Sequence, residues 1–415
     1  MTNGLDALNA ITDVVLRYKP PKKKKPKQRR SQARGFTFYE FFAGGGMARA
    51  GLGPSWKCLF ANDFDHKKSV TYKLNWKGNQ LLTKDVGKLE PSDVKGRADL
   101  TWASFPCQDL SLAGMGAGLR GDRSGTFWPF WRLMEQLKDE GRAPGVMVFE
   151  NVCGTLTSHS GKDFVAIADA VTNAGYRFGA VVIDAAEFVP QSRKRLFMIA
   201  VSADLEIPEE LTAEEPDPHR HTKALITAHG RLSGAARDQW IWWNVPAADK
   251  RVVTFSDVVE DDPDSVKWHT AEETKRLLSM MGPVHMKKLA AAKKDKKLHV
   301  GAIYKRTRLD EDGNKVQRAE VRFDDLAGCL RTSTGGSSRQ LILVVEGKSV
   351  RSRLISSRET ARLMGLPDSY KLPANYNEAY HLTGDGVVVP VVRHLAENIL
   401  EPMIAVAATQ KRATA

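Results

Sequence analysis

The chain of 415 residues is long enough for two domains, and its 42% hydrophobic and 27% charged residues are typical of a globular protein. No apolar run is long enough to span a membrane, and the first residues lack a signal-peptide pattern, so we expect a cytoplasmic protein with no membrane partner. The net charge of +13 favours a polyanionic partner, although a basic tail on an ordinary protein would give the same charge. The four cysteines form no C-x-x-C pair, which argues against a disulfide framework and predicts no metal site.

The N-terminal segment differs from the rest in composition. Residues 5–18 space their apolar side chains like a short amphipathic helix. Residues 17–30 then hold nine Lys or Arg and three Pro, a composition that cannot bury a core. We therefore predict that residues 1–30 form a disordered basic arm, which could be a DNA tether, a localisation signal or a solubilising tail.

From residue 36 onward, strand-like and helical patterns alternate. An apolar run at 36–42 leads into a glycine turn and then into small residues that suit a helix. Further strand-like runs are found at 58–63, 99–105, 145–151, 178–184 and 195–201, with helical patterns at 126–141 and 162–175. This alternation predicts an α/β fold with a mostly parallel, doubly wound sheet.

The alternation stops after about residue 205. Residues 240–244 (WIWWN) favour a core segment over a base-stacking platform, and 271–297 form a long basic helical stretch. Residues 304–323 predict a β-hairpin that turns at Asp-Gly-Asn. These changes divide the chain into the basic arm at 1–30, an α/β domain at 31–205, a second domain at 206–350, and a return to the first domain at 351–415.

The glycine turn is the first motif with chemical content. Phe42-Ala43-Gly44-Gly45-Gly46 follows a strand-like run, and a glycine turn in that place lets the backbone approach a bound nucleotide closely. Asp63 ends the next run, where a carboxylate can bind ribose hydroxyls. Taken alone, these residues fit a nucleoside cofactor, NAD included, or a tight packing turn.

Three further motifs follow strand-like runs. Cys107 comes after Pro106 at the end of a strand, where a thiol is either a nucleophile or a buried structural side chain. Glu150, in FENV, would lie near the same edge of the sheet or cap a helix. The QSRKR segment at 191–195 suits binding of a phosphate or a carbonyl oxygen, or is a solvated charge run.

These four motifs, in this order, resemble the DNA (cytosine-5)-methyltransferase family over about residues 36–201 and 350–400. The resemblance implies that residues 31–205 and 351–415 form a Rossmann-like catalytic and cofactor-binding domain that uses S-adenosylmethionine. It also implies that residues 206–350 are an inserted target-recognition domain. RETARLMGLPD at 358–368 and GDGV at 384–387 match the last two motifs of the family, except that Asp385 stands where the family usually has Asn. The cofactor contacts implied are Phe42, Gly44, Gly46, Asp63, Phe64, Asp85, Pro106, Asp385 and Val387.

The resemblance also implies a reaction. The Cys107 thiolate adds to carbon 6 of cytosine, Glu150 binds N3 and the exocyclic amine, and Arg195 holds O2. Arg193 holds O2 or the backbone, and Gln191 completes the catalytic set. A stacked base cannot reach a thiol, so the cytosine must flip out of the duplex, and the glycine-rich residues 114–125 are the loop expected to close over it. Contacts to DNA are expected from Gln108, Ser111, Arg331, Arg339 and Gln340.

We thus expect a monomeric, nucleoid-associated enzyme that methylates double-stranded DNA, as in restriction-modification or as a solitary enzyme. One alternative is a tRNA cytosine-5 methyltransferase on the same fold. A second is a catalytically silent DNA-binding relative, against which the intact Cys107, Glu150 and Arg195 argue. An NAD-dependent oxidoreductase would explain the glycines but not the PCQ and QSRKR segments.

Overall fold

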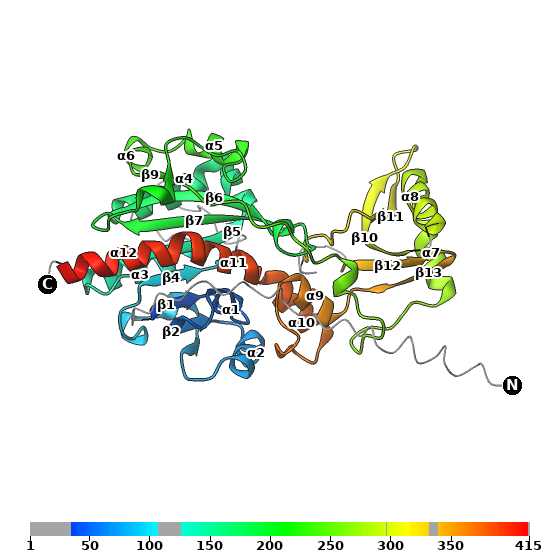
Figure 1. Ribbon diagram of the computed structural model, residues 1–415, viewed down its shortest axis with the longest axis horizontal. Coiled ribbons are helices and arrows are strands. Elements are labelled where there is room, and N and C mark those ends of the chain that lie inside the picture. The colour runs from blue at the N-terminus through cyan, green and yellow to red at the C-terminus, as the bar shows by residue number, and fades with distance from the viewer. Residues whose placement is uncertain (1–34, 107–125, 296, 332–338, 414–415) are drawn as a thin grey trace.

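A computed structural model describes residues 35–106, 126–295, 297–331 and 339–413, which form two domains beside each other (Figure 1). The basic arm at 1–30 and the expected closing loop at 114–125 lie outside these residues. None of the described helices is both long and apolar enough to cross a membrane.

The larger domain is built on a nine-stranded sheet of order β3-β2-β1-β4-β5-β7-β6-β9-β8. Strands β7 and β8 run opposite to the others, because β6 and β7 are joined by a short turn with no room for a crossover helix. The predicted α/β class with a mostly parallel sheet is confirmed. The strands are β1 (Phe36–Phe41), β2 (Trp56–Asp63), β3 (Leu81–Thr83), β4 (Leu100–Ala103), β5 (Val146–Val152), β6 (Tyr176–Asp184), β7 (Lys194–Ser202), β8 (Thr212–Ala213) and β9 (Trp240–Trp243).

Helices cover both faces of this sheet, since its strands alternate buried side chains to either side. One face packs against α1 (Met47–Leu52), α2 (His66–Asn75), α9 (Ser357–Leu363), α10 (Tyr376–Asp385), α11 (Val389–Leu395) and α12 (Glu401–Ala413). The other packs against α3 (Phe127–Asp139), α4 (Lys162–Asn173), α5 (Lys223–His229) and α6 (Gly234–Asp238). The C-terminal helices therefore complete the domain that the N-terminal half begins.

The catalytic sheet extends further along the chain than the sequence indicated. Strands β8 and β9 lie within the predicted recognition domain, yet both join the nine-stranded sheet, so the boundary placed at residue 205 is too early. The WIWWN segment forms β9 as a core segment, and the Trp243 side chain is fully buried. The prolines and acidic residues at 206–222 obscured this continuation, because they interrupt the strand–helix alternation without ending the sheet.

The smaller domain is a four-stranded antiparallel sheet of order β11-β10-β12-β13. Its strands are β10 (Leu298–Leu309), β11 (Lys315–Arg322), β12 (Leu341–Glu346) and β13 (Ser349–Leu354). The hairpin at β10–β11 turns at Asp-Gly-Asn as the sequence predicted. The predicted single helix at 271–297 is instead two helices, α7 (Ala271–Ser279) and α8 (Pro283–Lys294). The first ends at its C-cap Met280, and the second starts with Gly282 as its N-cap and Pro283 in its first turn.

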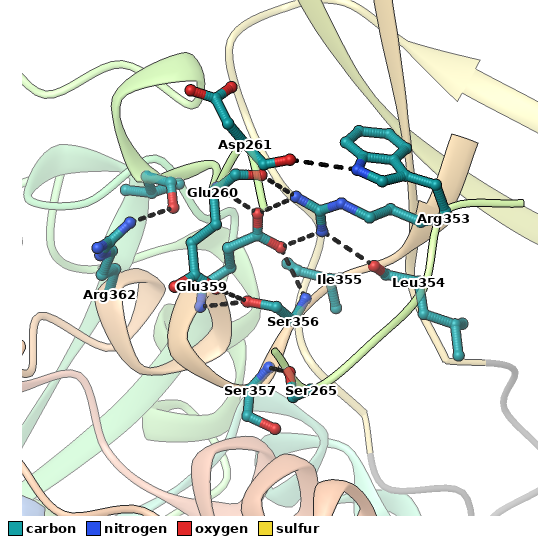
Figure 2. A network of polar contacts seen from close by, with 12 residues as sticks. Glu260, Asp261, Ser265, Arg353, Leu354, Ile355, Ser356, Ser357, Glu359 and Arg362 are labelled. Atoms are coloured by element: carbon teal, nitrogen blue, oxygen red, sulfur yellow. Dashed lines mark hydrogen bonds and ion pairs between the residues drawn. The ribbon is translucent and has the colours of Figure 1, made fainter. Parts of the chain in front are cut away.

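A buried ion pair joins the two domains where β13 leads into α9 (Figure 2). The Arg353 guanidinium donates to both oxygens of Glu359 at 2.7 and 2.6 Å, and both side chains are fully buried. Glu359 also accepts from the backbone N–H of Glu260 and of Ser356. A single carboxylate thereby holds together the segment at Glu260, strand β13 of the smaller domain and helix α9 of the larger one.

Candidate active site

The glycine turn after β1 is shaped by its backbone and by Asp63. Phe42, Gly44 and Gly46 all have positive φ, at 56°, 54° and 78°. The buried Asp63 carboxylate accepts from the Gly44 N–H at 2.7 Å and from the Asp65 N–H at 2.8 Å. Burial raises the pKa of Asp63, although these two bonds and Lys68 oppose the rise. A Cβ added at Gly44 would meet nothing within 4 Å, so the turn borders open space.

The middle of the turn is anchored from two distant segments. The carbonyl of Gly45 accepts from Trp76 Nε1 at 3.0 Å and from the Tyr370 hydroxyl at 2.7 Å. A Cβ at Gly45 would lie 2.3 Å from that hydroxyl, and one at Gly46 would lie 2.1 Å from Trp76 Nε1. Close packing therefore requires glycine at both positions, and the positive φ of Gly46 requires it there as well.

The remaining expected cofactor residues gather around the ends of β2 and β3 and around α10. The Phe64 ring is 67% exposed next to Asp63. Asp85 is exposed after β3, where it accepts from the Gly87 N–H at 2.8 Å. Val387 is buried, and the Asp385 carboxylate forms an ion pair with Lys68 at 2.7 Å. The negative charge of Asp385, where the family usually has an uncharged Asn, is thus paired with the Lys68 ammonium.

The catalytic motifs meet at the carboxyl ends of β4 and β5, which are parallel neighbours. Pro106 is exposed just beyond β4, while Cys107, Gln108 and Ser111 lie outside the described residues. Asn151, at the end of β5, donates to the Phe105 carbonyl at 3.1 Å. This bond fixes the segment that leads into Cys107 against the strand that carries Glu150.

Glu150 and Arg195 form the charged centre of the site. Arg195 Nε lies 3.2 Å from Glu150 Oε1, and the two side chains are only 15% and 7% exposed. The antiparallel register of β5 and β7 places Arg195 opposite Val152 and brings it within reach of Glu150. A carboxylate and a guanidinium held beside one another present an acceptor and donors to the same ligand.

Arg193 and Gln191 are buried beneath this pair. Arg193 donates to the carbonyls of Gly384 at 2.8 Å, Gly386 at 2.7 Å and Leu330 at 3.2 Å. Burial lowers its pKa to about 10. Gln191 donates to the Leu363 carbonyl and accepts from the Leu330 N–H. The donors of Arg193 are thus used on carbonyls of the protein backbone.

Cys329 was not anticipated in this site. Its Sγ lies 3.4 Å from Arg193 Nη1 and 4.0 Å from Arg195 Nη2. Burial alone would raise the pKa of the Cys329 thiol, but Arg193, Arg195 and Arg331 together lower it below its usual range. The sequence gives no sign of this neighbour, because it comes from the recognition domain.

The expected base-contacting residues of the recognition domain differ in exposure. Arg331 is exposed, and the Arg339 guanidinium lies over the Tyr376 ring, 5.7 Å from its centroid. Gln340 is only 1% exposed, and its Oε1 accepts from the Tyr304 hydroxyl and the Gly328 N–H. Gln340 is therefore a packing residue of the domain junction in this structure, and its side chain does not reach a surface where DNA could be contacted.

Comparison with known proteins decides the family. A family model described as C-5 cytosine-specific DNA methylase matches residues 36–401. The chain belongs to this family. The enzyme class expected for it, DNA (cytosine-5) methyltransferase, is thereby confirmed, and membership implies S-adenosylmethionine as the methyl donor.

Individual relatives agree with the family assignment. This methylase is 24% identical to the type II methyltransferase M.HhaI of Haemophilus parahaemolyticus over 370 residues, which cover 89% of this chain and 95% of that protein. It is similar to the crystal structure of a DNMT2 variant from Spodoptera frugiperda, with a TM-score of 0.57, 16% identity and coverage of 88% and 99%. A putative DNA modification methyltransferase from an E. coli prophage has a TM-score of 0.53, 17% identity and coverage of 89% and 99%. At these identities the two structures confirm the Rossmann-like fold alone.

Proposed function

We propose that this methylase transfers a methyl group to carbon 5 of a cytosine flipped out of duplex DNA, through a covalent bond between Cys107 and carbon 6. The observation that carries the proposal is the buried Glu150–Arg195 pair at the edge where β4 leads to Pro106 and Cys107. A pair of this kind offers an acceptor for the exocyclic amine of cytosine and donors for its O2.

Glu150 and Arg195 act on the charge that develops in the ring. When the Cys107 sulfur bonds to carbon 6, an electron pair moves toward N3 and O2. Glu150 acts as the general acid at N3 and Arg195 donates to O2, so both stabilise this charge. Carbon 5 then forms its bond to the methyl group that S-adenosylmethionine supplies when bound.

Release follows when a base removes the proton from carbon 5. The electrons of that C–H bond re-form the double bond between carbons 5 and 6, and the Cys107 thiolate leaves. Arg193 and Gln191 take no part in these steps. Their bonds to Gly384, Gly386 and Leu330 fix the strand that presents Arg195, which makes them positioning residues.

The residues around the glycine turn fit S-adenosylmethionine. Open space beside Gly44 admits a nucleoside, and the exposed Phe64 ring offers a face for adenine. Asp63 retains acceptor capacity for ribose hydroxyls beyond its two backbone bonds, and Asp85 offers an acceptor for the adenine amine. The Lys68–Asp385 pair lies at the end of α10, at the position that the family resemblance places near the methionine part of the cofactor.

The charge of the chain fits a polyanionic substrate, and the named relatives favour duplex DNA over tRNA. The net charge is +13, and the recognition hairpin presents four arginines, Arg306, Arg308, Arg318 and Arg322. Relatives that match about nine-tenths of the chain are named type II methyltransferases. A strongly basic surface attracts a polyanion such as duplex DNA.

A direct comparison of substrates tests the proposal. The protein is incubated with labelled S-adenosylmethionine and with either mixed-sequence duplex DNA or tRNA, and Cys107→Ala serves as the inactive control. We expect label in the duplex, at carbon 5 of cytosine, and none with Cys107→Ala. Transfer to tRNA alone would replace the proposal with the RNA alternative, and transfer to neither would support a silent relative.

A further inference from the structure

The two faces of the recognition sheet differ in kind. Buried side chains such as Ile303, Val321 and Leu343 lie on one face and pack with side chains of α7 and α8. These two helices lie on the side of the sheet away from the larger domain (Figure 1). The opposite face carries Arg306, Arg308, Arg318, Glu320 and Arg322, since the hairpin register places Arg306 opposite Arg318 and Tyr304 opposite Glu320. This face borders a cleft of about 550 Å³ that also includes Ser192 and Cys329 of the active site.

Arg308 on this face is held by a carboxylate in a specific way. Its Nε and Nη2 both lie against Glu320 Oε1, at 2.7 and 2.6 Å. The other carboxylate oxygen lies 3.3 Å from Arg306 Nε. Glu320 therefore binds the Nε–Nη2 edge of the Arg308 guanidinium. The other edge of this guanidinium, formed by Nη1 and the second N–H of Nη2, has no partner among the described residues.

The same arrangement is repeated at the other end of the hairpin. Arg322 Nε donates to Asp324 Oδ1 at 2.6 Å, and its Nη2 donates to Asp324 Oδ2. Arg322 ends β11 and leads to Ala327, which hydrogen-bonds to Pro190 and Ser192 beside the catalytic arginines. Arg308 lies toward the turn, about six residues or 20 Å farther from that junction.

These two carboxylates are better suited to base reading than to phosphate binding. A carboxylate beside an arginine cancels much of its attraction for phosphate, yet it fixes the direction of the guanidinium. The pairs are too exposed to serve stability, because Arg308 and Arg322 are 51% and 31% exposed. The free outer edge of a directed guanidinium matches N7 and O6 of guanine in the major groove.

We propose that Arg308 and Arg322 each read a guanine in the recognition sequence, oriented by Glu320 and Asp324. This inference rests on the proposed function. Because Arg322 lies nearer to the active site, it reads the guanine closer to the target cytosine, and Arg308 reads one farther away.

The first experiment maps the recognition sequence. The protein methylates a library of randomised duplexes, and the methylated cytosines are located by sequencing. We expect two positions where guanine is required. Arg322→Ala should relax the nearer one and Arg308→Ala the farther one, each by about 5- to 150-fold in preference for guanine. Arg276→Ala, on the outer helix α7, is the matched control and should change neither.

The second experiment begins with the unaltered protein, and that first measurement does not depend on the folding of a variant. Replacing one required guanine by 7-deazaguanine removes the N7 acceptor and should lower kcat/KM by a similar factor. The same replacement should have no effect on the variant that lacks the matching arginine. Glu320→Gln should weaken the preference for the farther guanine while raising affinity for DNA of any sequence, because a negative charge is lost.

Guanine preference retained in both arginine variants, or a recognition sequence with no guanine, would overturn the inference. Glu320→Gln raising affinity with the preference unchanged would show that Arg308 contacts phosphate instead. If the unaltered protein methylates no duplex at all, the proposed function itself has failed.

Discussion

The catalytic centre and the recognition hairpin both pair acidic with basic side chains, but at different depths. Glu150 and Arg195 are 7% and 15% exposed, and Arg193 beneath them is 2% exposed. On the hairpin, Arg306 and Arg308 are about half exposed around Glu320. A buried pair keeps its geometry and strength because water does not screen it, whereas an exposed pair is screened and contributes little to stability. The buried pair suits chemistry on a single base, and the exposed pairs suit contact with the surface of the DNA.

The largest effect is expected at the catalytic carboxylate. Glu150→Gln keeps the shape of the side chain but removes the proton donor for N3, so kcat should fall by about 100- to 10,000-fold. Single-turnover methyl transfer measures this rate. Glu346→Gln, at the exposed end of β12, is the control and should leave the rate unchanged. A rate for Glu150→Gln within a few-fold of the unaltered protein would remove Glu150 from the mechanism.

The buried pair between the domains tests the role of depth in stability. Glu359→Ala leaves the Arg353 guanidinium buried without a counter-charge, and should lower the free energy of unfolding by about 3–5 kcal/mol. Glu320→Ala removes the partner of a half-exposed arginine and should cost no more than about 1 kcal/mol. Urea denaturation of the two variants checks this contrast. Equal losses would contradict the argument from depth.

Glu40, in β1 behind the glycine turn, provides a test by pH. Burial raises its pKa from 4.5 to about 7, so the folded protein binds a proton more tightly than the unfolded chain. Its contribution to stability is therefore full below about pH 4.5 and is lost as the pH rises toward 7. The Gln side chain of Glu40→Gln does not titrate. As the pH rises from 4 to 8, the free energy of unfolding of this variant should therefore increase by up to about 3 kcal/mol relative to that of the unaltered protein. Thermal melting at each pH measures the difference in stability between the two proteins. A difference that does not change with pH would contradict the raised pKa.

The smallest effect is expected at the half-exposed Lys68–Asp385 pair. Asp385→Asn leaves the Lys68 ammonium unpaired on the side assigned to the methionine part of the cofactor, whose sulfonium is also positive. Affinity for S-adenosylmethionine should fall by up to about 5-fold, since an exposed pair contributes at most about 1 kcal/mol. The double variant Lys68→Ala, Asp385→Asn should recover most of it. Calorimetry in which Asp385→Asn binds as tightly as the unaltered protein would place the pair away from the cofactor.

Much of the fold could be predicted because its signals are local. The apolar runs and glycine turns marked β1, β2, β4, β5, β6 and β7, and the Asp-Gly-Asn turn marked the β10–β11 hairpin. The contribution of β8 and β9 to the large sheet could not be predicted. Their strands are short, and their pairing with residues far back in the chain leaves no periodic pattern.

The candidate site divides in the same way. The order of the motifs pointed to Glu150 and Arg195 as site residues, and the structure places their side chains in contact. The contacts of Cys329 with the catalytic arginines, of Tyr370 with Gly45 and of Lys68 with Asp385 join segments up to 325 residues apart. Such contacts depend on the folded topology, which a reading of local sequence does not supply.

The covalent step at Cys107 is the central claim, and trapping it is the most direct test. Duplex DNA with 5-fluorocytosine at the target position has no proton to lose from carbon 5, so the bond between Cys107 and carbon 6 should persist after methyl transfer. With S-adenosylmethionine present, we expect a protein–DNA complex that survives a denaturing gel for the unaltered protein and for Cys58→Ser, whose thiol lies in the core. Cys107→Ala should give no such complex. A trapped complex with Cys107→Ala, or its loss with Cys58→Ser, would contradict the assignment of the nucleophile.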